Sequence, residues 1–519
     1  MKKKLRYDLL LNSIFALCIG KANAMISNHQ VQLWKKDNYI ISSSPIKIDT
    51  LDPIKSINAH SKFTLPLIFE TLITTNSQQE LQPALAESWS LSADGKSITI
   101  TIKQNHRFSD NSEVTAQDVA NSLFRLCSVN SQEYGQLRGL VGCEESALGL
   151  PVKPQIFVTG KFTIRFTIES SPTTFLYQLA SPNTAIIKSA QHGLIGSGPY
   201  LVRKKRSNVL LLDKNPFYVG TIQVKNNGIV MLYVIGPDVS KALAENKIDS
   251  ALMYERQSLG ELNTNKYNLI TTAPNITELL VFNTQRYPFN KIEIRKALAA
   301  EIYNNFNCSC IPGAHKAYGI LPNGVAGSLT NMMPESLPNV APSKIFKKFP
   351  ALERDGVVVT IHQLSDLKNS CESEQIKQAA KKYNIHVNFT YHKDYSELAP
   401  LRATHNLDGF IELYVFKNRE AYNIFEYFAK NRNNHANINK NEIDKMLKEA
   451  TSVPSSHGRF QIYRKIAQYM QGQGMVIPLF YTEHGNLMSK CLTGISSDFN
   501  FNLFLELPKI SRLKYCGHV

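Results

Sequence analysis

The residues of this chain with the most reactive side chains are its thiols and imidazoles. Cys308 and Cys310 are separated by one residue, and His315 follows them, a combination of residue types that can bind soft metal ions. A structural thiolate site usually takes four ligands at firmer spacing, so a metal centre is only the alternative here. The chain has no G-x-S-x-G or H-E-x-x-H motif, and no candidate nucleophile has a motif partner nearby. We therefore predict no catalytic residue, no metal and no cofactor.

The glycine-rich stretch Gly196-Ser197-Gly198-Pro199-Tyr200 is a second place where chemistry is conceivable. A phosphate cradle would need a following Lys-Ser/Thr pair or a G-x-G-x-x-G frame, and neither is present. The glycines and the proline instead predict a fixed turn between a loop and a strand.

The segment 81–126 has the strongest local signals for the elements that would position a site. Asp94-Gly95 is a hairpin dipeptide, and Ile98, Ile100 and Ile102 alternate after it as in a half-buried strand. Thr115 with Asp118 three residues later predicts a capped helix. The segment is therefore predicted to fold as strand, turn, strand, loop and helix.

The N-terminus has the pattern of a secretory signal peptide. Basic residues precede an apolar run from Leu9 to Gly20, and Ala22-Asn23-Ala24 follows, so we expect cleavage after Ala24. Lipidation at Cys18 is the less favoured alternative because the bulky Leu17 precedes it.

The predicted mature chain of 495 residues carries a net charge of about +12, which we interpret as a lysine-rich solvated surface. An exported protein is not expected to act on nucleic acid in the cytoplasm.

Seven of the eight cysteines remain after this cleavage. In an oxidising compartment Cys127 with Cys143 and Cys491 with Cys516 are two candidate pairs, among several that the sequence leaves open. Cys308 and Cys310 are too close in sequence for an unstrained bridge with each other.

A set of uncommon residues recurs in one order in and around the segment 81–126: Pro83, Leu85-Ala86-Glu87-Ser88-Trp89, Asp94-Gly95, Phe108, Asp110, Thr115-Ala116-Gln117-Asp118-Val119 and Arg125. Their order resembles that of the bacterial extracellular solute-binding proteins of family 5, the peptide/nickel class of receptors that hand ligands to ABC importers. Asn111 stands where a family member usually has glycine, and asparagine tolerates positive φ next best.

The resemblance extends over nearly the whole mature chain. Leu51-Asp52-Pro53 is similar to an early family element, and Gly196 to Tyr200 is similar to the family's "G-T-G-P-Y". Leu280 to Thr284, followed by Pro288-Phe289, is similar to the segment that carries the chain from the first lobe into the second. The resemblance therefore implies a hinge near Asn283.

The stretch Gly409-Phe410-Ile411-Glu412-Leu413 matches the family's "G-W-x-x-D" element, which in peptide-binding members supplies an aromatic wall and a carboxylate for the ligand's α-ammonium group. The resemblance implies that Phe410 forms the wall. Leu413 holds the aspartate position and cannot neutralise an ammonium group. Glu412 would have to substitute, although neighbouring side chains on a strand point to opposite faces. Gly409, Phe410, Glu412 and Leu413 are our ligand-binding candidates, with plain core packing as the alternative for Phe410 and Leu413.

The implied fold class is α/β, a bilobal type II periplasmic-binding-protein fold of cluster C. It has two mixed-sheet lobes joined by a hinge and an extra subdomain in the first lobe. We expect a signal peptide at 1–24, lobe I at 40–280 with the subdomain at about 76–195, lobe II at 285–480, and a C-terminal return to lobe I at 481–519.

The implied function is that of a periplasmic receptor of an ABC importer. It would act as a monomer, capture a peptide or peptide-like ligand between its lobes, and deliver it to permease subunits in the inner membrane. Haem, a metal chelate, an opine or an oligosaccharide are alternative ligands. A secreted enzyme on the same scaffold and a basic envelope-binding protein are alternatives of a different class.

Overall fold

The computed structural model describes residues 26–513, apart from 45–46, 49, 57–58, 77–79, 132, 138, 192, 207, 235–236, 254–265, 272–273, 275, 312, 324, 326, 329–337, 365–370, 393–394, 417–420, 430–440, 454–455, 483–484 and 495–505. The predicted leader at 1–24 and the predicted pairing of Cys516 lie outside the described residues.

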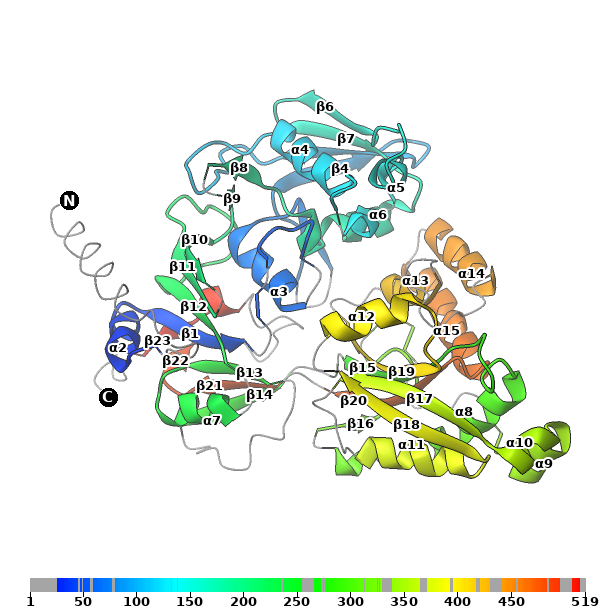
Figure 1. Cartoon of the computed structure of the whole chain (residues 1–519). Helices are drawn as coiled ribbons and strands as arrows, with labels where there is room; N and C mark the ends of the chain where they lie inside the picture. The colour runs from blue at the N-terminus through cyan, green and yellow to red at the C-terminus, as the bar shows by residue number, and fades with distance from the viewer. Residues whose placement is uncertain are drawn as a thin grey trace.

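Lobe I is built on a seven-stranded mixed sheet (Figure 1). Strand β1 runs parallel to both of its neighbours, β12 and β13, and the remaining pairs are antiparallel. Alternate residues of β1 enter different cores, because Ile40 packs with helix α3 and Ile41 packs with α2 and α7 on the other face. In spatial order the strands are β10 (Tyr200–Arg206), β11 (Val209–Lys214), β12 (Gly228–Tyr233), β1 (Tyr39–Ser44), β13 (Ser250–Met253), β21 (Gly485–Ser489) and β14 (Tyr267–Thr271), and the helices are α2 (Asn28–Lys36), α3 (Ala59–Ile68) and α7 (Pro237–Ala244).

A subdomain inserted in lobe I contains a four-stranded antiparallel sheet in the order β4-β5-β7-β6 (Figure 1). Helix α4 covers one of its faces, and its buried residues share a core with the strands. The elements are β4 (Ala86–Leu91), β5 (Ser97–Ile102), β6 (Ile156–Gly160), β7 (Thr163–Thr167), α4 (Ala116–Leu126), α5 (Cys143–Ala147), α6 (Pro172–Leu179), η1 (Tyr134–Leu137) and η2 (Pro182–Thr184), with the small hairpins β2 (Ile73–Thr75) with β3 (Leu81–Pro83) and β8 (Lys188–Ala190) with β9 (Gly193–Ile195).

The local predictions for the segment 81–126 are confirmed. Gly95 has a φ of 67° in the turn between β4 and β5, and the three alternating isoleucines of β5 are buried. At the start of α4, the Asp118 carboxylate accepts hydrogen bonds from the Thr115 backbone N–H (2.9 Å) and hydroxyl (2.6 Å). Asn111, which stands where a family member usually has glycine, has a φ of 70°, a conformation that glycine and asparagine tolerate best. Cys127 and Cys143, one of the two candidate pairs, form a disulfide that joins the end of α4 to α5.

Two further sequence elements meet in space. Asp52 and Arg125 form a bidentate ion pair, in which Arg125 Nη1 lies 2.7 Å from Asp52 Oδ1. This pair fastens the start of lobe I to the end of α4.

A side chain at Gly196 or Gly198 would collide with the backbone of Ile68. The glycine-rich stretch is therefore a close-packed turn, as predicted.

Lobe II is built on a six-stranded mixed sheet covered on both faces (Figure 1). Helices α8 and α11 pack against one face, and α13, α14 and α15 pack against the other. The predicted βαβ unit is confirmed as β17, α11 and β18, with the two strands parallel. In spatial order the strands are β16 (His315–Lys316), β20 (Val476–Thr482), β15 (Ile276–Phe282), β19 (Gly409–Val415), β17 (Val357–Leu364) and β18 (Ile385–His392), and the helices are α8 (Ile292–Asn305), η4 (Cys308–Cys310), α9 (Pro342–Lys348), α10 (Pro350–Asp355), α11 (Cys371–Lys381), α12 (Tyr395–Ala403), α13 (Tyr422–Ala429), α14 (Asn441–Ser452) and α15 (Ser456–Gly472).

The chain passes between the two sheets twice. Strand β14 ends at Thr271 in lobe I and β15 begins at Ile276 in lobe II. Strand β20 ends at Thr482 in lobe II and β21 begins at Gly485 in lobe I. Both crossings therefore lie at the end of the lobe II sheet where β15 starts and β20 stops.

The C-terminal segment after β21 packs on lobe I, with β22 (Leu492–Thr493) paired to β23 (Ser511–Arg512) after η7 (Leu507–Lys509). Asn226 fixes this segment, because its amide donates to the carbonyls of Leu507 (2.7 Å) and Ile510 (2.9 Å) and accepts from the Tyr200 hydroxyl (2.8 Å).

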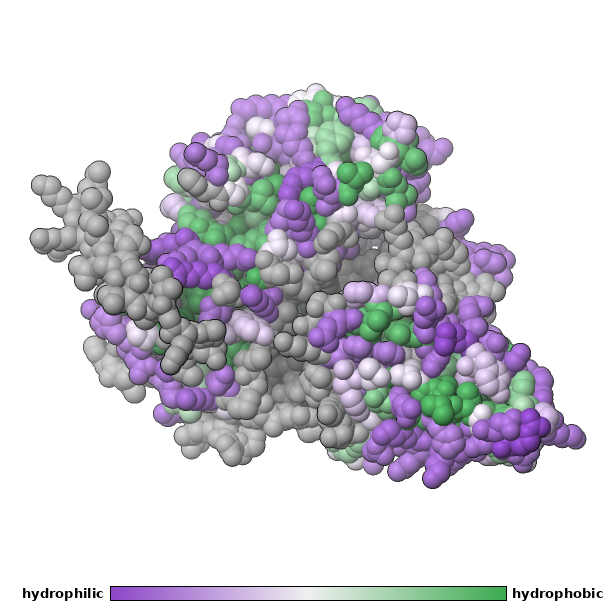
Figure 2. Space-filling view, viewed as in Figure 1, coloured by the Kyte–Doolittle hydropathy of each residue, from purple (hydrophilic) through white to green (hydrophobic). Residues whose placement is uncertain are grey.

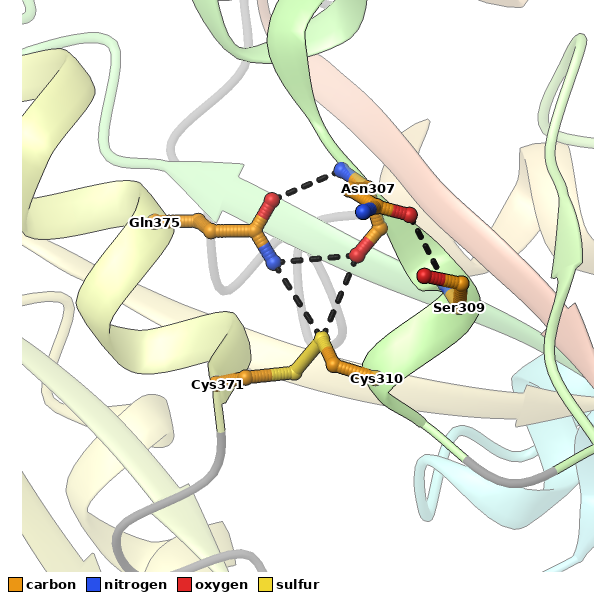
Figure 3. The surroundings of a disulfide bond; sticks show 5 residues. All are labelled: Asn307, Ser309, Cys310, Cys371 and Gln375. Atoms are coloured by element: carbon orange, nitrogen blue, oxygen red, sulfur yellow. Dashed lines mark hydrogen bonds between the residues drawn. A yellow bond between two sulfur atoms is a disulfide. The ribbon is translucent and has the colours of Figure 1, made fainter.

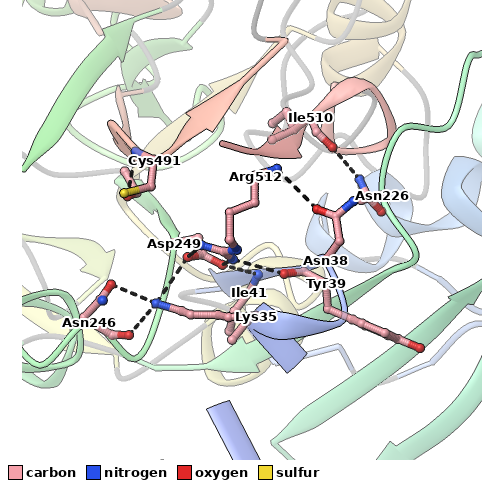
Figure 4. A network of polar contacts seen from close by, with 11 residues as sticks. Lys35, Asn38, Tyr39, Ile41, Asn226, Asn246, Asp249, Cys491, Ile510 and Arg512 are labelled. Carbon is pink, nitrogen blue, oxygen red and sulfur yellow. Dashed lines mark hydrogen bonds and ion pairs between the residues drawn. The ribbon is translucent and has the colours of Figure 1, made fainter. Parts of the chain in front are cut away.

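Asp249, which is wholly buried, joins three distant parts of lobe I (Figure 4). Its carboxylate accepts from Arg512 Nη2 (2.6 Å), Arg512 Nη1 (3.0 Å) and the backbone N–H of Ile41 (2.9 Å). The Lys35 ammonium lies 3.4 Å from Oδ1, and burial lowers the pKa of Lys35 while Asp249 opposes that effect. One carboxylate therefore holds α2, β1, β13 and the C-terminal segment together.

Hydrophilic residues cover much of the coloured surface of the molecule (Figure 2). Several exposed lysines pair with acids on the same or a neighbouring element, as Lys377 does with Glu374, Lys348 with Glu293 and Lys382 with Glu301. This distribution agrees with the interpretation of the basic charge as a solvated surface.

Replacing Asp249 by asparagine should destabilise the protein strongly, because it leaves the buried Arg512 and Lys35 without a compensating charge. We expect the free energy of unfolding, measured by urea denaturation without reductant, to fall by about 3–5 kcal/mol. The control is Asp355→Asn, which removes one member of a fully exposed pair with Arg354 and should leave the free energy unchanged. Equal stability of the two variants would contradict the central role of Asp249.

Candidate functional site

The four predicted ligand-binding residues lie on β19, which runs between β15 and β17 in the lobe II sheet. Gly409 pairs with Phe282 on one side and Ile361 on the other. A Cβ at Gly409 would lie 2.8 Å from both the Val281 carbonyl oxygen and the Ile361 Cδ1, so only glycine fits there.

Phe410 and Glu412 point to the face of the sheet that α12 to α15 cover. Phe410 is 1% exposed and packs in that core, with the Arg402 guanidinium 4.3 Å from its ring centre. The Glu412 carboxylate accepts from Arg402 Nη1 and from the Tyr427 hydroxyl (3.3 Å). Burial raises the pKa of Glu412, and the charge and hydrogen bond of Arg402 lower it. Glu412 thus has a permanent cationic neighbour inside the protein.

Arg402 is a polar residue of this region that sequence reasoning missed. It lies on α12, is wholly buried, and its guanidinium also lies 5.5 Å from the ring centre of Tyr427. A lone arginine on a short helix with no periodic partner gives no local sign of burial, because its ion pair and ring contacts come from other elements.

Leu413 points to the opposite face and is 39% exposed. Its direct partner on the neighbouring strand is Glu278 of β15, whose side chain is therefore on the same face. Glu278 is only 3% exposed. The chain thus has an acid beside the family's aspartate position, one strand away.

Glu278 belongs to a buried polar group at the start of α11. Glu372, in the first turn of that helix, is wholly buried, and its two carboxyl oxygens have no hydrogen-bond partner among the described residues. Burial raises the pKa of Glu372 to about 7, so this carboxyl holds its proton up to near-neutral pH. Gln363 of β17 is also wholly buried, and its Oε1 accepts from the Ser373 hydroxyl at 3.4 Å. Gln363 Nε2 has no hydrogen-bond partner among the described residues.

A disulfide between Cys310 and Cys371 ties η4 to the start of α11, next to Glu372 (Figure 3). Gln375 supports it by donating to the Asn307 carbonyl (3.0 Å) and accepting from the Asn307 N–H (2.7 Å). No spacing or motif in the sequence marks this pairing. Because the Cys310 sulfur is bonded in this disulfide, it cannot act as a thiolate ligand together with Cys308 and His315. The described residues contain no group of three or more side chains placed to hold a metal ion. Cys308 is a free, half-buried thiol, and Cys491 is disulfide-bonded.

Asn283 lies just past the end of β15, inside lobe II. Its side chain donates to the carbonyls of His405 (2.9 Å) and Leu407 (2.8 Å), so it fastens the loop that leads into β19. The crossings between the sheets are at the other end of β15, at 271–276, and at 482–485. A hinge role for Asn283 stays a prediction, and its position in the structure favours the support of β19.

The residues around Leu413 lie near the junction of the lobes. Glu278 is two residues from Ile276, where β15 begins after the crossing. Val415, two residues beyond Leu413, packs against the core of lobe I. A depression of about 400 Å³ lined by Glu87, Lys103, Gln104, Asn105, His106 and Val219 is also present, but all its lining residues belong to lobe I.

Comparison with known proteins places the chain in a family. Residues 80–436 match the family described as "Bacterial extracellular solute-binding proteins, family 5 Middle". The chain therefore belongs to the family 5 solute-binding proteins of ABC importers, which are binding proteins and not enzymes.

Individual relatives are similar over almost their full length. The probable D,D-dipeptide-binding periplasmic protein DdpA of Escherichia coli (strain K12) is 23% identical over 509 residues, covering 88% of this chain and 90% of the relative. The structure of the Escherichia coli murein tripeptide binding protein MppA matches with a TM-score of 0.77 and 18% identity, covering 92% of this chain and 99% of that chain. NikA from Brucella suis in complex with Fe(III)-EDTA matches with a TM-score of 0.75 and 17% identity, covering 92% of this chain and 100% of that chain. The type II bilobal fold is thus shared by proteins whose named ligands differ in chemistry.

If Glu412 serves the interior of lobe II, its replacement by glutamine should lower stability, because Arg402 is then a buried charge without its acid. We expect a loss of about 3 kcal/mol in the free energy of unfolding by urea. The matched control is Glu449→Gln on the exposed side of α14, which should change the free energy little. A fully stable Glu412→Gln protein would show that the Arg402 pair is not structural.

The raised pKa of Glu372 predicts a pH-dependent stability. Between the ordinary value of 4.5 and about 7 the folded state holds a proton that the unfolded state has lost, so the free energy of unfolding falls as pH rises through this range. Glu372→Gln stays neutral, and its stability relative to the wild type should rise from near zero at about pH 4.5 to about 3 kcal/mol above about pH 7. Urea denaturation at a series of pH values measures this difference. Glu374→Gln, on the exposed side of the same helix, should show no such trend.

Proposed function

We propose that this protein is the periplasmic receptor of an ABC importer that captures a peptide or peptide-like ligand between its lobes. The observation that carries the proposal is the combination of the family match with two mixed-sheet lobes joined by two chain crossings. Such a protein works by closing around its ligand, so that groups of both lobes complete the contacts and water is removed. No covalent step is needed.

The assignment of the strands to two separate sheets supports a division of the chain into two lobes. Lobe I would take residues 40–280 and the C-terminal segment 481–519, and lobe II would take residues 285–480. Strand β21, near the C-terminus, lies in the lobe I sheet between β13 and β14. The two crossings at 271–276 and 482–485 are then the places where the angle between the lobes would change.

The proposed location is the periplasm, reached through cleavage of the leader at 1–24. Relatives such as DdpA are named as periplasmic proteins, and none of the described helices is long and apolar enough to cross a membrane. The partner would be the permease subunits of the importer, approached by the protein as a monomer.

Because leucine stands at position 413, where the family's peptide-binding members have aspartate, a non-peptide ligand is a second candidate. An apolar residue at that position cannot pair with an ammonium group, and Glu412 is engaged with Arg402 on the other face. A metal chelate, an opine, an oligosaccharide or haem would not need this acid, and the related Brucella suis NikA structure has an Fe(III) chelate bound.

The proposal is tested by native mass spectrometry of the mature protein purified from its own periplasm. We expect a mass above that of the chain, and short peptides or a peptide-like molecule in the fraction released by denaturation. The emptied and refolded protein should show a smaller radius of gyration by X-ray scattering when the released fraction is returned. The same fraction from a periplasm lacking the protein is the control.

A released non-peptide molecule that closes the protein would support the second candidate. A protein that carries nothing, and whose radius of gyration does not change with any fraction, would contradict the receptor function.

A further inference from the structure

The disulfide of lobe II lies beside a third cysteine. Cys310 and Cys371 are bonded, and Cys308, two residues before Cys310 in the one-turn helix η4, is a free thiol. Cys310 is exposed, whereas Cys308 and Cys371 are half-buried. An odd cysteine in an exported chain is a candidate for a reactive thiol. One disulfide bond can therefore be made among these three sulfurs in more than one way.

The turn η4 lies along the beginning of α11, as Figure 3 shows for the residues on either side of Cys308. Asn307, just before Cys308, exchanges two hydrogen bonds with Gln375, which lies one turn into α11. Cys310 is bonded to Cys371 at the start of that helix, and the Cα atoms of these two residues lie 6.3 Å apart. Cys308 is thus between two residues that contact α11, and only about 4 Å from Cys310 along the axis of the turn.

The surroundings of the Cys310 sulfur are those of a thiol (Figure 3). Gln375 Nε2 donates to this sulfur at 3.5 Å, and the Asn307 carbonyl oxygen lies 3.3 Å from it. A sulfur in a disulfide has no hydrogen to donate, so Cys310 can give Asn307 a hydrogen bond only after the disulfide is broken. A donor and an acceptor are therefore already in place for the thiol that such a break would release.

Packing alone does not account for the three cysteines. Cys308 packs against the core that α8 and α11 share with the lobe II sheet, and any small apolar side chain would serve that purpose. A crosslink between η4 and α11 also needs only one cysteine in the turn. A second thiol beside a disulfide allows thiol–disulfide exchange, in which a thiolate attacks one of the bonded sulfurs. Exposed disulfides are the labile ones, and Cys310 is exposed.

We propose that Cys308, Cys310 and Cys371 form a thiol-exchange site, in which the crosslink to α11 moves between the two cysteines of η4. The Cys308 thiol gives its proton to solvent, and the thiolate attacks the Cys371 sulfur. The Cys308–Cys371 bond forms as the Cys310–Cys371 bond breaks, and the electron pair leaves on the Cys310 sulfur, which takes a proton from solvent and donates to Asn307. One disulfide and one thiol are present before and after, so no oxidant or reductant is consumed. The free thiol moves from a half-buried to an exposed position, where reagents in solution can modify it.

The test uses the mature protein, purified without reductant, and a bulky maleimide that reacts with exposed thiols. We expect label on Cys310 together with a new Cys308–Cys371 disulfide, increasing over the minutes to hours that uncatalysed disulfide rearrangement takes. Non-reducing peptide mapping with fragment-ion sequencing distinguishes Cys308 from Cys310, which share one tryptic peptide. The disulfide between Cys127 and Cys143 is the control and should stay unlabelled. Label found only on Cys308, with the Cys310–Cys371 bond intact at all times, would overturn the proposal.

Two variants separate internal exchange from accidental opening of the disulfide. Cys308→Ser removes the attacking thiol, so Cys310 and Cys371 should stay bonded and unlabelled. In Cys310→Ser the remaining two cysteines should form the Cys308–Cys371 disulfide and leave no free thiol among them. Urea denaturation without reductant checks that both variants fold, and the wild-type labelling does not depend on either of them. Label on Cys310 at the wild-type rate in Cys308→Ser, or free thiols at Cys308 and Cys371 in folded Cys310→Ser, would contradict the exchange. These results are independent of the receptor function, because no ligand is involved.

Discussion

The architecture of lobe I depends on the buried carboxylate of Asp249. It receives Arg512 from the end of the chain, the backbone N–H of Ile41 from the first strand, and the Lys35 ammonium from the helix before it. These groups are far apart in sequence, and burying two cations would be costly without the shared acid. Because the C-terminal segment must return to meet Asp249, the chain has to leave lobe II again, and this second crossing places β20 next to β15 at the lobe junction.

The two crossings decide where a site can form in lobe II. They lie at one end of β15 and β20, so residues near that end, such as Glu278 and Leu413, are close to lobe I. The far end of β15 is fastened by Asn283 to the loop before β19. Strand β19 is therefore held at its start by lobe II and reaches lobe I at Val415, which gives its alternate side chains two different environments. Phe410 and Glu412 enter a covered core, and Leu413 remains partly open.

The sequence predicts the parts of this fold that depend on neighbouring residues. The turn at Asp94-Gly95, the cap at Thr115 and the βαβ unit around α11 have local causes and are present. The Cys310 to Cys371 disulfide, the burial of Arg402 and the burial of Glu278 and Glu372 depend on contacts between distant segments. No spacing or periodicity marks them, so a single sequence cannot reveal them. The resemblance thus selects β19 for the candidate site, which stays a prediction, while the buried acid beside Leu413 on β15 is seen only in three dimensions.

The two-residue period of a β-strand explains why Glu278, and not Glu412, lies on the same face of the sheet as Leu413. Moving one residue along β19 from Leu413 reverses the direction of the side chain, and Glu412 accordingly meets Arg402 behind the sheet. Moving sideways to the paired residue of the adjacent strand keeps the same face, and the residue found there is Glu278. An acid at 278 can thus occupy nearly the same region as one at 413, with a different approach direction. The buried carboxyl of Glu372, whose pKa burial raises to about 7, lowers the free energy of unfolding as the pH rises through neutrality.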